Sequence, residues 1–91
     1  MPVEVRLPTM LRGDAGGQAS VKANGSTIGE VLDDLALQFP RLGGKIVTDD
    51  GVLHRFVNVY RNDEDVRYLD KLDTKLADDD VVTILPAVAG G

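Results

Sequence analysis

One stretch of helical periodicity, with short strand-like segments on both sides, limits the possible folds of this 91-residue chain more than any other feature. Thr27 is followed three residues later by Glu30, which is a capping-box pattern for the start of a helix. Pro40 is expected to end the helix, because proline cannot donate the backbone hydrogen bond that a helix interior needs. The apolar residues that recur at helical spacing are Ile28, Val31, Leu32, Leu35 and Phe39. The sequence predicts one main helix in a single domain, since a chain of this length has no room for a second core.

Segments before and after the helix alternate apolar with polar residues, as half-buried strands do. Before the helix, we expect a strand over residues 3–7, a glycine-rich turn over 12–17 and a return strand over 18–23. After it, we expect residues 42–50 to be irregular, because Gly43 and Gly44 are breakers. The remaining chain is expected to form strands at 56–61 and 81–85, acidic turns at 62–65 and 78–80, and a short strand or one helical turn at 70–76.

The order of these elements selects the fold class. The later connections are too short for a second crossover helix, so one helix must cover one sheet. Placing the first and last strands side by side in the middle of the sheet, with the helix diagonally across them, would bury most of the apolar residues. The sequence therefore predicts an α+β fold of the ubiquitin-like β-grasp kind, with a mixed sheet of four to five strands.

Composition excludes several classes of function. The net charge of −5 and the scattered positions of the ten basic residues argue against nucleic-acid binding. The chain has no cysteine, so a disulfide, a zinc thiolate site and a cysteine nucleophile are all excluded. The first eleven residues lack a continuous apolar run, so we expect neither a signal peptide nor a membrane span, and a cytoplasmic location.

Two further candidate sites are not favoured. His54 has no recognisable nucleophile beside it, so a structural or interface role is expected rather than general base catalysis. The acidic runs at 49–50, 63–65 and 78–80 do not have the spacing of a calcium loop, and we expect no metal site.

The uncharged end of the chain is the most informative segment. We expect residues 1–86 to form the β-grasp domain and residues 87–91 to form a flexible tail: Ala87, Val88, Ala89, Gly90 and Gly91. Two glycines make a slender end and leave the carboxylate of Gly91 approachable from either side. Five residues at about 3.3 Å each extend roughly 17 Å, enough to enter a partner's active site. The alternative is an ordinary frayed terminus.

A tail with so few contact groups needs a docking face on the domain, because ordering it costs conformational entropy. If Val57, Val59, Val82 and Ile84 face the helix, alternation places Phe56, Tyr60, Thr83 and Leu85 on the opposite face of the sheet. We expect Phe56, Tyr60 and Leu85, together with tail residues 87–90, to contact partners. The alternative, that Phe56 and Tyr60 only cover the sheet's edge, stays open.

The ending TILPAVAGG and the stretch FVNVYRNDEDVR resemble the ThiS/MoaD family of sulfur carriers, and within it the carriers of cysteine synthesis in actinobacteria. The resemblance implies a carrier that is not an enzyme. An E1-like partner would adenylate the Gly91 carboxylate, a sulfur donor would convert it to a thiocarboxylate, and a synthase would take the sulfur. The chain has no glycine-rich phosphate loop, so the ATP would belong to the partner and no cofactor would be bound. We expect a monomer when the carrier is free.

Two alternatives use the same tail. One is a ubiquitin-like protein modifier, which would pass the activated terminus to a lysine. The other is the small subunit of a molybdopterin synthase, whose tail would stay inserted in a large subunit.

Overall fold

A computed structural model of the protein describes residues 2–87, and its centre is one mixed sheet with strand order β2-β1-β5-β3-β4. Strands β1 and β5 are parallel neighbours, with Val5 opposite Val82, and every other pairing is antiparallel. The first and last strands therefore lie side by side in the interior of the sheet, as the sequence predicted. The strands are β1 (Pro2–Arg6), β2 (Ser20–Asn24), β3 (Val57–Arg61), β4 (Glu64–Asp65) and β5 (Val81–Pro86).

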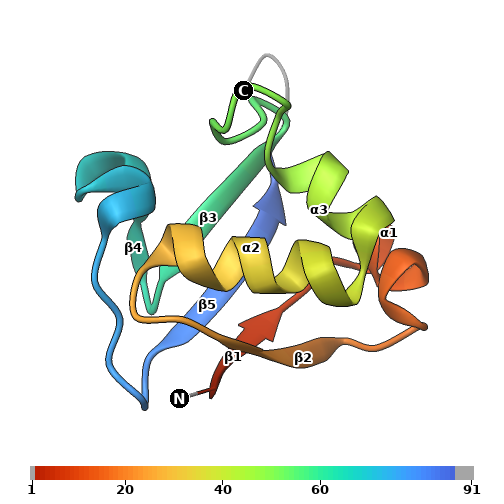
Figure 1. Ribbon diagram of the computed structural model, residues 1–91, viewed down its shortest axis with the longest axis horizontal. Coiled ribbons are helices and arrows are strands. Elements are labelled where there is room, and N and C mark those ends of the chain that lie inside the picture. The colour runs from red at the N-terminus through yellow and green to blue at the C-terminus, as the bar shows by residue number, and fades with distance from the viewer. Residues whose placement is uncertain (1, 88–91) are drawn as a thin grey trace.

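The longest helix, α2 (Ile28–Gln38), crosses one face of this sheet (Figure 1). The Thr27 hydroxyl accepts a hydrogen bond from the Glu30 N–H (3.2 Å), which is the predicted cap. The Glu30 carboxylate binds the N–H and hydroxyl of Ser26 (2.8 and 2.9 Å), one residue earlier than the usual capping box. These bonds to Ser26 lower the pKa of Glu30. The buried helix residues are Ile28, Val31, Leu32 and Leu35, four of the five predicted; Phe39 follows the helix and packs partly buried against the core.

The prediction of an irregular segment after Pro40 is wrong. Residues 40–46 form a second helix, α3 (Pro40–Ile46), and Pro40 begins this helix at its first turn, where a missing N–H costs nothing. Leu42 and Ile46 are fully buried. Gly43 lies where α3 crosses α2, and a methyl group at its position would overlap Cβ of Ala36. Gly43 is therefore a contact residue between helices and not a breaker.

The connection between β1 and β2 also contains helical structure that the sequence did not predict. A short helix α1 (Thr9–Arg12) continues into one 3₁₀ turn, η1 (Gly13–Ala15). Leu11 and Ala15 are buried and close one end of the core. The glycine turn itself is confirmed, since Gly16 and Gly17 have φ of 68° and 84°. Because the turn extends further than expected, β2 begins at Ser20 instead of residue 18.

The segment between β4 and β5 forms two 3₁₀ turns, η2 (Val66–Tyr68) and η3 (Lys71–Asp73). Of the two predictions for residues 70–76, the helical turn is the one observed. It is anchored by Thr74, a polar residue with 2% exposure, whose carbonyl accepts the Ile28 N–H (2.9 Å). This segment therefore rests on the start of α2.

Candidate functional site

Strand β5 runs through the interior of the sheet and ends at Pro86, one residue before the end of the described part of the chain. Val82 and Ile84 are fully buried under α2, which fixes the direction of the strand. The N–H of Ala87 still donates to the carbonyl of Phe56 (2.8 Å), so the pairing alongside β3 persists through the last described residue. Of the predicted tail residues, Val88, Ala89, Gly90 and Gly91 lie outside the described part of the chain.

The predicted alternation across β3 and β5 is confirmed. Val57 and Val59 are buried with Val82 and Ile84, while Phe56 and Leu85 are 52% and 42% exposed. Leu85 lies opposite Asn58 near the end of the pairing between β3 and β5, so Phe56 and Leu85 both lie near the end of β5. Tyr60 lies further along β3, between Thr83 and Asp65, and is half-buried. The structure thus places Phe56 and Leu85, two of the three predicted docking residues, near the end of β5. The third, Tyr60, lies further back, between two neighbouring strands.

The Phe56 ring is held by the two residues before it. The ring centroid of His54 lies 4.8 Å from that of Phe56, and the guanidinium carbon of Arg55 lies 5.2 Å from it, within cation–π range. The Phe56 N–H also points at Nδ1 of His54 (3.4 Å). His54 is thus a structural neighbour of the candidate docking residue, which agrees with its expected role.

A groove of about 570 Å³ runs beside the end of β5, between that strand and α1. It exists because the chain turns away from the sheet after β1, at Pro8, and leaves the last part of β5 without a neighbour on that side. Leu85 and Pro86 line one wall, and Met10, which is 67% exposed, lines the other. Sequence reasoning missed Met10, because it lies in a helix of four residues that has no detectable periodicity.

Two arginines complete the groove. Arg6 binds Glu4 (2.7 Å), and this bond lowers the pKa of Glu4. Arg12 donates from Nε to the carbonyl of Leu7 (3.1 Å), which holds it against the turn after β1. The end of β5 is therefore bordered by three exposed apolar side chains, those of Phe56, Leu85 and Met10. The guanidinium groups of Arg6 and Arg12 lie beside them.

The described residues contain neither a candidate metal site nor a membrane-spanning helix. Among residues 2–87, no three His, Asp or Glu side chains lie together as metal ligands would. Nor does any helix within that range have the length and apolar character to cross a bilayer. The last described residue, Ala87, lies next to Phe56, one of the exposed apolar side chains near the end of β5.

Comparisons with known proteins agree with this geometry. The sequence model of the ThiS family matches residues 5–91. The sulfur carrier protein CysO of Mycobacterium tuberculosis is 52% identical over 93 residues, covering all of both chains. The small archaeal modifier protein 3 of Haloferax volcanii is 35% identical over 94 residues, again over the full length of both.

One solved structure is similar to this chain in both fold and sequence. The crystal structure of the Amycolatopsis orientalis BexX/CysO complex contains a chain that superposes with a TM-score of 0.89 at 47% identity, covering 98% of this chain and 99% of that one. The predicted β-grasp fold and the predicted similarity to sulfur carriers are both confirmed.

Proposed function

Because this chain belongs to the ThiS family, we propose that it carries sulfur on its C-terminal carboxylate, at Gly91. The observation that carries the proposal is the extent of the family match, which includes the two final glycines. The structure supports a separation between the folded domain and the reacting group. Hydrogen bonds hold β5 in the sheet and continue to Ala87, so chemistry at Gly91 need not disturb the fold.

The proposed reaction has two steps in an E1-like partner. An oxygen of the Gly91 carboxylate attacks the α-phosphorus of ATP, pyrophosphate leaves, and an acyl adenylate forms. A sulfur donor supplies hydrosulfide, whose sulfur attacks the carbonyl carbon; AMP leaves, a proton is released, and a thiocarboxylate results. Activation is required because a carboxylate is a poor electrophile until it carries a leaving group, whereas the thiocarboxylate sulfur is a good nucleophile.

Delivery requires an acceptor enzyme. We propose that a synthase presents an electrophilic carbon, that of an activated serine in cysteine synthesis, to the thiocarboxylate sulfur. The sulfur forms a bond to that carbon while the activating group of the serine leaves, which joins acceptor and carrier. Hydrolysis of the acyl–sulfur bond by water then leaves the sulfur on the acceptor as a thiol and returns the carboxylate of Gly91. The carrier is consumed and regenerated in this cycle, so it acts as a co-substrate and not as an enzyme.

Intact-mass analysis tests the chemistry. Protein isolated from its native host, or incubated with its activating enzyme, ATP and a sulfur donor, should gain about 16 Da, the difference between sulfur and oxygen. Deletion of Gly91 should abolish this gain without changing the unfolding midpoint. Gly44→Ala, at a glycine with open space around it, is the matched control and should still be thiocarboxylated. Thiocarboxylation of the deletion variant would contradict the proposal.

We further propose that Phe56, Leu85 and Met10 form the docking face for these partners, with Tyr60 at its margin. A few residues that become buried at the centre of an interface, aromatic ones prominent among them, carry most of the binding energy. Phe56→Asp should lower kcat/KM for adenylation by about tenfold or more, since a hot-spot residue contributes at least about 1.4 kcal/mol. Leu37→Asp is the matched control, because Leu37 is 82% exposed on α2. Equal losses in both variants would refute this docking face.

The protein-modifier alternative is favoured by one observation, the identity with the archaeal modifier. Conjugates of high mass that survive reducing agents, in cells expressing the intact chain, would support it. A discrete transfer of sulfur to a small acceptor would support the carrier. A stable complex with a large subunit would instead support a molybdopterin synthase subunit.

A further inference from the structure

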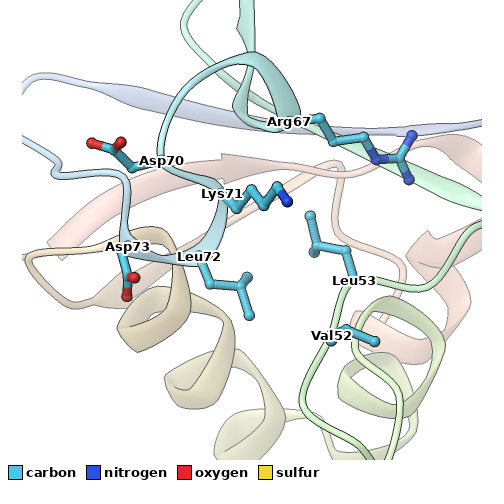
Figure 2. Close-up of a pocket in the computed structure, with 7 residues that line it drawn as sticks. All are labelled: Val52, Leu53, Arg67, Asp70, Lys71, Leu72 and Asp73. Carbon is cyan, nitrogen blue, oxygen red and sulfur yellow. The ribbon is translucent and has the colours of Figure 1, made fainter.

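A second hollow, of about 510 Å³, lies away from the groove beside β5. One wall comes from the loop between α3 and β3, through Val52 and Leu53, and the other from the 3₁₀ turns η2 and η3 (Figure 2). Its size falls within the range of small-molecule pockets in proteins, roughly 300–1,000 Å³. Neither the sulfur chemistry nor the docking face uses its residues.

The floor of this pocket is apolar and fixed. Leu53 and Leu72 are partly buried and pack against the core, so their exposed sides form a surface that cannot collapse inward. Figure 2 shows both side chains extending into the space between the two walls, with Val52 at the lower edge. Val52 is 56% exposed, so an apolar ligand group there would remove apolar surface from water.

Positive charge borders this apolar floor. The side chain of Lys71 extends across the pocket toward Leu53, and Arg67 lies beyond it (Figure 2). The two aspartates of the lining, Asp70 and Asp73, point away from this space. Within residues 2–87 the ion pairs are Arg6 with Glu4, Lys45 with Asp14 and Arg61 with Glu64, so neither cation of the pocket is in one.

The backbone of Lys71 is held in one conformation by the turn around it. Its φ is 55°, in the left-handed region that residues with a Cβ rarely occupy. The turn keeps it there: the Asp70 N–H donates to the buried hydroxyl of Thr74 (3.1 Å), and the Thr74 N–H donates to the Lys71 carbonyl (3.1 Å). Backbone strain of this kind persists where surrounding contacts over-determine it, and it is concentrated at ligand sites.

Arg67 is fixed from the other side. One terminal nitrogen of its guanidinium donates to the side-chain oxygen of Asn58 (2.6 Å), and the other donates to the carbonyl of Val57 (2.9 Å). A guanidinium has five N–H donors, so these two bonds orient the group and leave donors for a ligand. The guanidinium of Arg67 is thus oriented before anything binds, which reduces the entropy cost of binding.

We propose that this pocket binds a small organic anion: a carboxylate attached to an aromatic or branched aliphatic body. The carboxylate contacts the ammonium group of Lys71 and the guanidinium of Arg67. The apolar body covers Leu53, Leu72 and Val52. The chemistry selects this class because a cation pair over an apolar floor complements a molecule that has both parts, and neither inorganic anions nor neutral hydrocarbons satisfy both.

The probe is 4-phenylbutanoate, added to the full chain while backbone amide shifts are followed by NMR. Shifts should concentrate at residues 52–53 and 67–73 and saturate at one site. The neutral analogue 4-phenylbutan-1-ol should bind more weakly by more than about fivefold, because it loses the contacts to both cations and one partly exposed ion pair contributes up to about fivefold. Acetate, which lacks the apolar body, should leave these amides unshifted.

Lys71→Gly separates binding from folding. Glycine accepts φ near 55° without strain, so this variant should be at least as resistant to urea as the natural chain. It should bind 4-phenylbutanoate about fivefold more weakly. Lys22→Met, which removes an exposed lysine on β2, is the matched control and should bind as the natural chain does. Equal binding of acid and alcohol, unchanged binding by Lys71→Gly, or the absence of saturable shifts at these residues would each overturn the proposal.

Discussion

At the scale of single residues, side-chain hydrogen bonds join turns that are far apart in the sequence. Asp80, just before β5, accepts from the Ala77 N–H (2.8 Å) and from the side chain of Asn62 (3.0 Å). Asn62 has φ of 55° and also accepts the Val81 N–H through its side-chain oxygen (3.0 Å). The sequence identified both segments as acidic turns, but their partnership depends on tertiary structure and could not be predicted from local composition.

Asp80 should make stability depend on pH. Its hydrogen bonds, first that from Ala77 and then that from Asn62, lower its pKa below the usual 3.8. The bonds stabilise the charged form, so their contribution is fully present above pH 3.8 and is lost as pH falls through the lowered pKa. Asp80→Asn should therefore reduce the free energy of unfolding by up to about 1 kcal/mol at pH 7, since solvent screens a group this exposed.

Urea denaturation at pH 7 and at about pH 3 checks this, with the difference between variant and natural chain expected to shrink at the lower pH. Asp78→Asn, an exposed position in the same turn, is the control and should change little at either pH. A difference that grows on acidification would show that the sign is wrong.

Residue patterns also predicted which side chains lie on each face of the sheet. Period-two alternation placed Val57, Val59, Val82 and Ile84 correctly, because each strand has one face under α2. The alternation could not distinguish Phe56 and Leu85, near the end of β5, from Tyr60, which lies between two neighbouring strands. That difference depends on which strands are neighbours. Met10 was missed for a similar reason: its exposure follows from where β1 leaves the sheet.

At the scale of elements, the sequence predicted those that have strong local signals. The helix α2 has a capped start and an apolar face, and both are visible in the sequence. The helix α3 has no side-chain cap, and Gly43 and Gly44 are poor helix formers. It forms because Leu42 and Ile46 are buried against the core, a tertiary gain that outweighs its weak intrinsic propensity.

Adjacent glycines in α3 should respond oppositely to the same substitution. Gly43→Ala would overlap Ala36 and force α2 and α3 apart, which should cost about 1–3 kcal/mol, as overpacking does. Gly44→Ala meets nothing within 4 Å and should stabilise the helix by about 0.5–1 kcal/mol. Thermal unfolding of the two variants measures both effects, and a similar change in both would mean that the close helix contact is absent in solution.

At the scale of the whole molecule, one of the two edge strands of the sheet, β2, is covered by side chains. An uncovered edge can pair with another chain, which leads to association. The side chain of Gln38 donates to the Lys22 carbonyl (2.9 Å), and the Asp34 carboxylate accepts the Asn24 N–H (2.9 Å). Helix α2 thus supplies hydrogen-bond partners to β2 along its free edge.

Removing that cover should promote self-association. Asp34→Ala combined with Gln38→Ala would leave backbone groups of β2 unpaired, and sedimentation velocity should then show concentration-dependent dimers. Asp33→Ala combined with Leu37→Ala, on exposed positions of the same helix, gives the control, which should remain monomeric. If both pairs behave as the natural chain does, side-chain cover of this edge does not determine the oligomeric state.

The hydrogen bond between Ala87 and Phe56 also limits the architecture of any enzyme that acts on Gly91. Gly91 is four residues beyond Ala87, and four residues span at most about 14 Å when fully extended. An enzyme that leaves this bond intact must therefore place its reactive atoms no deeper than that below the surface it presents to the carrier. A deeper channel would require the end of β5 to separate from Phe56 first, at a cost in binding energy.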